Sequence, residues 1–231
     1  MYFERLKLAL PAVRERIDRA CRRVGRAGAE AVVIVAVTKG HSLEALRAAA
    51  EVGLETIGEN RVQEARQKYE AAGDLGLRWH LVGHLQRNKV RQALKIFELI
   101  HSVDSLRLGL AIDREAAKLG RRAAVLVQVN ASGEGAKYGL PVDEALSVAS
   151  GLCEMDNLRV VGVMTMAPFV SDEEILRRTF RRTRRLYDEC REHLVKFEAR
   201  HLSMGMTNDF EIAVEEGSTM LRLGTVLFGE R

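Results

Sequence analysis

The residues best suited to chemistry are a lysine that follows an apolar run and two glycine-bearing segments near the end of the chain. Lys39 comes directly after AVVIVAVT (31–38), a β-branched run typical of a strand buried on both faces. At the mouth of a low-dielectric strand bundle a lysine loses hydration, which favours the neutral amine that attacks an aldehyde. The alternative is an ordinary lysine whose ammonium group reaches water at the rim.

The two glycine-bearing segments, SMGM and RLGT, combine small residues with hydroxyl groups, a composition that suits a phosphate site. Gly205 and Gly224 would let the backbone approach phosphate oxygens closely, or they would simply serve the geometry of two loops. The hydroxyl groups of Ser203 and Thr225 are candidate donors to the same oxygens.

An arginine and two histidines also lie near predicted strand ends. Arg222 precedes Gly224 by two residues; facing inward it could donate to a ring nitrogen, and facing outward it would form a salt bridge. His80 and His84 have an HxxxH spacing that suggests a metal ion. On a strand that runs into a loop, however, these two side chains share a face only loosely and no third ligand is evident, so we expect no metal site.

Composition indicates a globular, water-soluble chain, because 47% of its 231 residues are hydrophobic and 29% are charged. The apolar stretch 31–37 is too short to span a membrane, which takes about 20 residues. The first residues alternate in charge and lack the pattern of a signal peptide, so we expect a cytoplasmic protein. Three widely spaced cysteines indicate reduced thiols rather than disulfides or a zinc site: Cys21, Cys153 and Cys190.

The net charge of +4 raises the question of nucleic acid. Much of the excess lies in one arginine-rich predicted helix, where Arg177, Arg181 and Arg185 form a stripe. Acidic residues nearby can pair with this stripe along the helix, and no aromatic residues interleave with it. We expect a solvated outer face and no nucleic-acid binding; a phosphate- or RNA-binding module is the alternative.

Helix-like and strand-like segments alternate along the whole chain. An amphipathic helix comes first, with predicted core positions at Leu6, Leu8, Val13, Ile17 and Cys21. Eight predicted strands follow, at 31–40, 55–60, 79–84, 98–104, 123–130, 158–166, 199–205 and 219–225. The predicted helices between them begin after Ser42 and then cover 61–72, 88–95, 105–119, 142–154, 172–195 and 209–216.

This alternation calls for parallel strands joined by right-handed crossovers. An open doubly wound sheet is possible, but eight units in 231 residues match a (β/α)8 TIM barrel closely. We therefore predict an α/β fold with one barrel domain over residues 1–231 and the first helix as an extra element outside it. Functional side chains of such a barrel gather at the carboxyl ends of the strands, which would bring Lys39 close to the glycine-bearing segments.

Seven motifs resemble, in order, those of the pyridoxal phosphate homeostasis proteins. The motifs are VAVTKG, IGENRVQEA, WHLVGHLQRNK, IHSVDS, GVMTMAP, LSMGMTNDF and GSTMLRLGTVLFG, and they run from about residue 30 to the C-terminus. The resemblance implies a barrel of the alanine racemase N-terminal-domain type that holds pyridoxal 5′-phosphate (PLP) as a Schiff base.

Carried over motif by motif, the resemblance makes Lys39 the Schiff-base lysine and places Asn60 near the cofactor. It assigns the phosphate cup to four residues and the pyridine nitrogen to Arg222. The four phosphate residues are Ser203, Gly205, Gly224 and Thr225. Lys137, in the loop after the fifth strand, is a candidate for a neighbouring role, and no role follows for His101.

Differences from the alanine racemases bear on activity. Those enzymes resemble this barrel but carry a second, β-rich domain that supplies a catalytic tyrosine, and only six residues follow Thr225 here. Met166 stands where the racemase-like pattern offers a ring-stacking histidine. An arginine at the ring nitrogen disfavours the pyridinium form that most PLP chemistry exploits, although the racemases share that arginine.

The resulting expectation is a monomeric PLP-binding protein, not an enzyme, that buffers the cofactor or delivers it to apo-enzymes. The alternative from another class is a PLP-dependent amino-acid racemase or a related enzyme.

Overall fold

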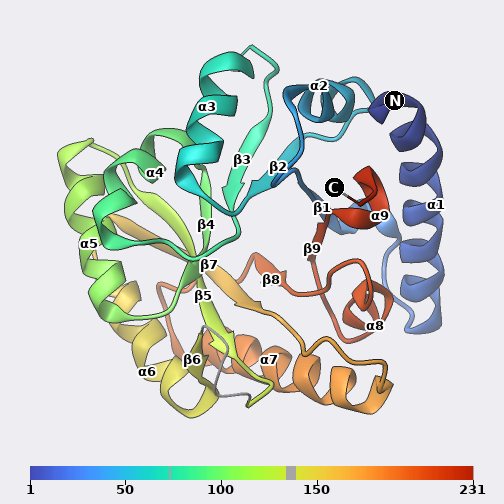
Figure 1. The fold of residues 1–231 in the computed structure, drawn as a ribbon. Coiled ribbons are helices and arrows are strands. Elements are labelled where there is room, and N and C mark those ends of the chain that lie inside the picture. Colours follow the sequence, from blue (N-terminus) through green and yellow to red (C-terminus); the bar gives the residue numbers. More distant parts are fainter. Residues whose placement is uncertain (73, 134–138, 231) are drawn as a thin grey trace.

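A closed barrel of parallel strands forms the centre of the computed structural model, which describes residues 1–72, 74–133 and 139–230 (Figure 1). β1 pairs with β2 on one side and β9 on the other, and β4 pairs with both β3 and β5, so the sheet closes on itself. This closure confirms the predicted barrel over an open sheet. The barrel strands are β1 (Val33–Val37), β2 (Thr56–Glu59), β3 (Arg78–Leu81), β4 (Leu99–Val103), β5 (Ala123–Asn130), β7 (Leu158–Thr165), β8 (His201–Ser203) and β9 (Met220–Leu223).

Helices surround the strands, as Figure 1 shows. They are α1 (Tyr2–Arg23), α2 (Leu43–Glu51), α3 (Val62–Ala72), α4 (Val90–Ile96), α5 (Leu106–Lys118), α6 (Val142–Cys153), α7 (Glu173–His193), α8 (Phe210–Glu215) and α9 (Thr225–Phe228). Two 3-10 helices, η1 (Ala29–Ala31) and η2 (Arg87–Lys89), and a short strand, β6 (Leu140–Pro141), complete the described elements. Each predicted strand and helix is present, with strand ends shorter by one to three residues at most positions.

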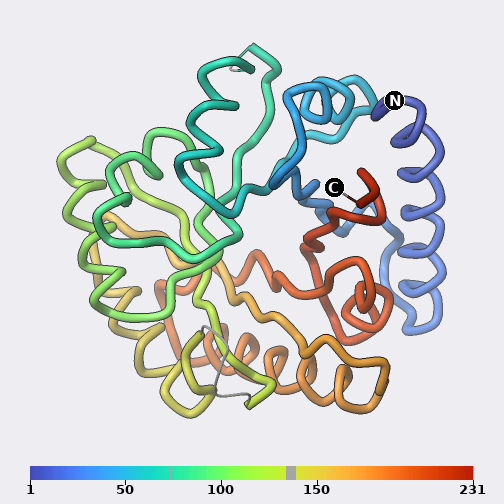
Figure 2. Tube along the Cα trace, viewed as in Figure 1, coloured from blue at the N-terminus to red at the C-terminus, as the bar shows by residue number. Residues whose placement is uncertain are grey.

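The first helix packs on the outside of the barrel against α2, α8 and α9, so the two ends of the chain lie side by side (Figure 2). Its buried positions include Leu6, Leu10, Val13 and Ile17, which recur at the helical spacing. The prediction of Leu8 as a core residue is wrong, because that side chain lies on the opposite face and is 76% exposed.

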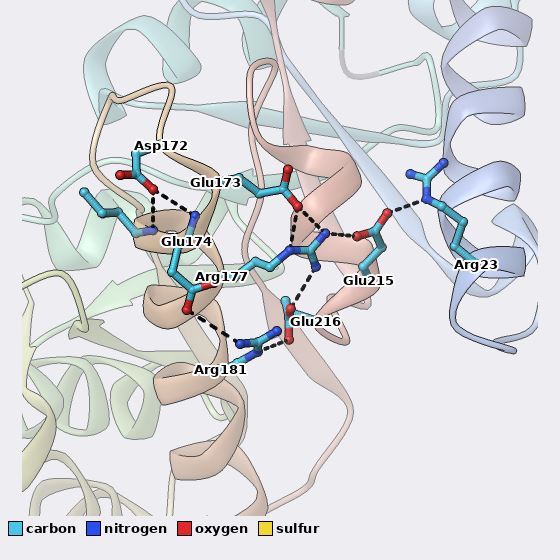
Figure 3. Close-up of polar contacts among 9 residues, drawn as sticks. Arg23, Asp172, Glu173, Glu174, Arg177, Arg181, Glu215 and Glu216 are labelled. Atoms are coloured by element: carbon cyan, nitrogen blue, oxygen red, sulfur yellow. Dashed lines mark hydrogen bonds and ion pairs between the residues drawn. The ribbon is translucent and has the colours of Figure 1, made fainter.

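Several arginines of α7 form ion pairs within the chain, and Figure 3 shows those of Arg177 and Arg181. Arg177 pairs with Glu173 at 2.6 Å, with Glu216 at 2.9 Å, and with Glu215, which also binds Arg23 of α1. Pairing along the helix was predicted, whereas pairing with Glu215 and Glu216 at the end of α8 was not. The arginine stripe therefore joins three helices, which favours a structural role over a nucleic-acid surface.

The described residues also bear on the excluded classes of site. No described helix is long and apolar enough to cross a membrane. The three cysteines are buried and not joined in disulfides, as predicted. His80 and His84 have different partners, since His80 Nδ1 lies 3.1 Å from His101 Nε2 and His84 Nδ1 lies 3.8 Å from an Asp104 oxygen.

Alternation along the strands divides the buried side chains into an outer core under the helices and an inner core within the barrel. In β9, Leu221 belongs to the outer core and Met220 to the inner one, so Arg222 points inward. Polar groups continue from Arg222 through the interior, because Ser203 Oγ lies 3.1 Å from His101 Nδ1, which is followed by His80. This chain of hydrogen bonds runs through an inner core whose other side chains are mostly apolar.

Burial keeps both of these histidines neutral. Desolvation, aided by the nearby charges of His201 and Arg78, lowers the pKa of His80 to about 3. Desolvation also holds the pKa of His101 well below its ordinary value. Since protonation of either ring requires a charge inside the barrel, the inner core tolerates acid poorly.

We expect acid to destabilise the fold through these two imidazoles. Below about pH 6.5 the unfolded chain takes up protons that the folded protein refuses, so the stabilisation is present above that pH and is lost as pH falls towards the folded-state values. Each imidazole should lower the free energy of unfolding by up to about 1.4 kcal/mol per pH unit. Urea unfolding at about pH 7, 6 and 5 measures this slope.

The matched variants are His80→Gln, which should flatten the slope, and His193→Gln, which changes an exposed histidine and should leave it unaltered. The opposing contribution of Glu59, whose pKa burial raises, is common to all three proteins and cancels. Equal slopes in wild type and His80→Gln would contradict the expectation.

Candidate functional site

A cavity of about 260 Å³ opens at the carboxyl end of the barrel. Residues that follow β1, β2, β7, β8 and β9 line it. A second cavity of about 290 Å³ adjoins it and shares Val37, Lys39, Gly224 and Thr225 as lining residues. Functional groups of parallel barrels gather at this end of the strands, so this concave region is the candidate site.

The closing pair of strands explains why residues from opposite ends of the chain meet here. In the β1–β9 register, Val35 lies opposite Arg222 and Ala36 opposite Leu223. The carboxyl ends of β1 and β9 therefore lie side by side, and the segments that follow them bring Lys39 close to Gly224. Five of the seven predicted site residues line the first cavity: Lys39, Asn60, Arg222, Gly224 and Thr225.

The other two predicted residues, Ser203 and Gly205, are not among the residues that line this cavity. Ser203 is fully buried, and its hydroxyl oxygen accepts a hydrogen bond from Arg222 Nη1 at 2.7 Å. Gly205 has a φ of +98°, and a Cβ there would lie 2.6 Å from the Cβ of Ala213. Ser203 thus holds the Arg222 side chain, and Gly205 shapes the turn between β8 and α8.

Lys39 occupies the second position of a tight turn. The Thr38 carbonyl accepts a hydrogen bond from the His41 N–H at 3.0 Å, and Gly40 has a φ of +73°. A positive φ at the third residue alone is the signature of a type II turn, which a glycine accommodates without steric cost. The turn directs the chain from β1 across the mouth of the barrel, where the lysine lines both cavities.

Arg222 brings a permanent positive charge to the cavity wall. Its Nη2 donates to the Thr165 carbonyl at 2.7 Å, so two of its five N–H donors serve Thr165 and Ser203. Desolvation lowers the pKa of this guanidinium to about 10, an effect that the nearby Asp209 partly offsets. The group is cationic at neutral pH and acts only as a donor.

Backbone N–H groups are available where Thr225 begins α9. The first N–H groups of a helix have no acceptor inside it, which suits them to an anion. Two of them are already engaged, because the Val226 N–H lies 3.4 Å from Thr207 Oγ1 and the Leu227 N–H donates to the Gly224 carbonyl at 2.9 Å. The protein leaves space beside the Gly224 backbone, since a Cβ there would meet only two described atoms within 4 Å, the Val37 carbonyl oxygen at 3.4 Å and the Val37 Cβ at 3.7 Å.

Two lining loops were missed by sequence reasoning. The loop after β8 contributes residues 206–209, and the loop after β7 contributes residues 167–170. Both follow directly on the predicted strands 158–166 and 199–205, and the rule that sites gather at strand ends would have found them if it had also been applied to the loops that follow.

Two residues that the sequence could not assign lie elsewhere. Lys137 lies outside the described residues. His101 is fully buried behind Ser203 and does not line the cavity, so any influence on the site passes through Ser203 and Arg222.

These groups define the ligand chemistry that the site suits. The amine of Lys39 can condense with a carbonyl carbon, the guanidinium of Arg222 can donate to a ring nitrogen, and the start of α9 can hold an anion. A small anionic aldehyde with a heteroaromatic ring combines these features.

Comparisons with known proteins agree with this geometry. The family model described as alanine racemase, N-terminal domain, matches residues 8–231. A solved structure of PipY from Synechococcus elongatus, described as having PLP bound, is 34% identical with a TM-score of 0.82 and covers 92% of this chain and 100% of that chain. An alanine racemase from Clostridium difficile, 17% identical with a TM-score of 0.79, covers 99% of this chain and 60% of that chain and shows the shared fold alone.

Among curated relatives, the pyridoxal phosphate homeostasis protein of Aquifex aeolicus is 43% identical over 223 residues, which are 96% of this chain and 96% of that protein. The corresponding protein of Helicobacter pylori (strain ATCC 700392 / 26695) is 37% identical over 201 residues, with 86% of this chain and 88% of that protein covered. This chain belongs to the family of the pyridoxal phosphate homeostasis proteins.

Proposed function

We propose that this protein binds PLP through Lys39 and serves PLP homeostasis by buffering the cofactor or passing it on. The observation that carries the proposal is the meeting of Lys39, Arg222 and the Gly224–Thr225 segment around one cavity. The PLP-bound structure described for PipY and the names of the curated relatives support it.

The residues present fit this cofactor group by group. A neutral Lys39 amine would form a C=N bond with the aldehyde carbon, and the carbonyl oxygen would leave as water, so the attachment reverses by hydrolysis or by exchange with another amine. Gly224 and Thr225 would hold the phosphate, and Asn60 would lie beside the ring. Ser203 and Gly205 take indirect parts, the one by orienting Arg222 and the other by shaping the loop that follows β8.

Bound PLP supplies an electron-withdrawing ring, and the residues around this cavity make little use of it. Arg222 can only donate, so it would pair with an unprotonated ring nitrogen, and this pairing would weaken the withdrawal of electrons by the ring. Of the described side chains that line the first cavity, those that titrate are Lys39, Asp209 and Arg222. The Asp209 carboxylate already accepts from the Met206 N–H at 2.5 Å. This donor set favours a carrier over a racemase, which needs proton transfer on both faces.

The proposal extends to a single-domain, monomeric, cytoplasmic protein that delivers PLP to apo-enzymes. Matching over nearly the full length of the relatives supports one domain spanning residues 1–231.

We expect Lys39→Ala to abolish covalent PLP binding. Wild-type protein should show an imine absorption band, and borohydride reduction followed by peptide mapping should place the label on Lys39. Loss of the covalent bond should weaken PLP binding by about 100-fold or more. The variant should release PLP at least as fast as wild type, and an added apo-enzyme should take up the released PLP at least as fast. Lys118→Ala, which changes an exposed lysine paired with Glu115, is the matched control. Label on another lysine, or a band that persists in Lys39→Ala, would count against the proposal.

We expect no sustained turnover of amino acids. The PLP-loaded protein, incubated in deuterium oxide with L- and D-amino acids, should give at most one equivalent of spectral change, with no continuing deuterium exchange at Cα followed by mass spectrometry. Deuterium exchange of many equivalents of amino acid per protein would contradict the carrier role and indicate an enzyme.

A further inference from the structure

Both neighbours of Lys39 are held by charged side chains on the outer side of the barrel. Lys68 Nζ donates to the Thr38 carbonyl at 2.7 Å, and the Thr38 hydroxyl donates to Glu59 Oε1 at 2.6 Å. On the other side of the lysine, the Gly40 N–H donates to Glu64 Oε1 at 2.6 Å. We call Glu59, Glu64 and Lys68 the turn clamp.

The three clamp residues also bind one another. Lys68 Nζ lies 2.7 Å from Glu59 Oε1 and 2.8 Å from Glu64 Oε1. Glu59 ends β2 with its side chain directed away from the barrel interior, while Glu64 and Lys68 stand one helical turn apart on α3. None of the three lines the first cavity, so the clamp acts on the turn and not on a ligand there.

Stability alone gives a poor account of this clamp. Glu59 is fully buried, and among the described residues its Oε2 has no hydrogen-bond partner. Burial raises the pKa of Glu59, against the hydrogen bonds from Lys68 and Thr38 that lower it. Since a buried ion pair is often no more stabilising than an apolar pair of similar volume, the gain lies in geometry.

The geometry concerns the backbone on each side of one residue. The clamp binds the carbonyl and hydroxyl groups of Thr38 and the N–H of Gly40, and the turn itself is closed by the His41 N–H. With the flanking groups held, the Cα–Cβ direction of Lys39 is set before any ligand arrives. Holding a reacting group in advance favours bond formation, and small displacements are costly.

We propose that Glu59, Glu64 and Lys68 are positioning residues that hold the Lys39 turn so that its amine meets an aldehyde in the cavity. The inference rests on the proposed function and deepens it. The clamp governs formation of the covalent bond and leaves the pocket for phosphate and ring intact.

The test compares PLP with pyridoxine 5′-phosphate, which has the phosphate and ring but no aldehyde. Glu64→Ala removes the acceptor of the Gly40 N–H, while Glu64→Gln keeps a carbonyl oxygen in its place. We expect Glu64→Ala to weaken PLP binding about tenfold, the value of one hydrogen bond, and to change pyridoxine 5′-phosphate binding by less than about twofold. Glu64→Gln should restore PLP binding to within about twofold of wild type.

Two further variants sharpen the comparison. Lys68→Met should have a larger effect on PLP than Glu64→Ala, provided that it folds, because it also leaves Glu59 without its cation. Glu70→Ala breaks the exposed Arg66–Glu70 pair on the same helix and should leave the affinities for both ligands unchanged. Equal weakening of both ligands in Glu64→Ala, or unchanged PLP binding, would overturn the positioning role.

Hydrogen exchange gives a readout that needs no cofactor. In unliganded protein, the Gly40 amide should exchange about tenfold faster in Glu64→Ala than in wild type or Glu64→Gln, measured by NMR or mass spectrometry. Unchanged exchange would overturn the clamp. A wild-type protein that bound no PLP would contradict the proposed function, and exchange would still decide whether the clamp holds the turn.

Discussion

The parallel pairing of β1 with β9 is the contact on which the candidate site depends. It closes the barrel and brings the turn after β1 next to the turn after β9. Parallel strands in register end at the same edge, so the lysine that follows one strand meets the glycine and helix start that follow the other. Without this contact, Lys39 and Arg222 would be side chains from opposite ends of a chain.

Closure of the barrel buries polar groups on both sides of its wall, and their removal from water costs free energy. Inside, Arg222 is 5% exposed and donates hydrogen bonds to Ser203 and Thr165, with two neutral histidines beyond. Outside, Glu59 and Lys68 are paired beneath α3. Buried polar groups without partners are strongly destabilising, so these contacts restrict the chain to few arrangements. Both networks end next to a residue that lines the cavity.

Charge elsewhere in the chain serves a different purpose. Arg177 of α7 and the carboxylates of α8 join helices that pack on neighbouring sectors of the barrel, and Arg23 extends the network to α1. The excess of arginine that raised the question of nucleic acid is thus partly explained by contacts between helices. Local periodicity revealed the stripe and its pairing within α7, but its other carboxylate partners, Glu215 and Glu216, come from a segment distant in sequence.

The sequence by itself determined the order of strands and helices, the barrel, and five residues that line the cavity. Apart from Asn60, which came from the resemblance of its motif, these follow from local rules, because hydrophobic periodicity and strand ends are properties of short segments. Leu8 was an error in applying such a rule, because residues two apart on a helix do not share a face and Leu10 completes the spacing of Leu6 and Val13. Only the tertiary structure decided that Ser203 binds Arg222 instead of lining the cavity, and that Glu59, Glu64 and Lys68 hold the turn at Lys39. These contacts join residues from different strands and helices, and their energies depend on distance and burial, which exist only once the chain has folded.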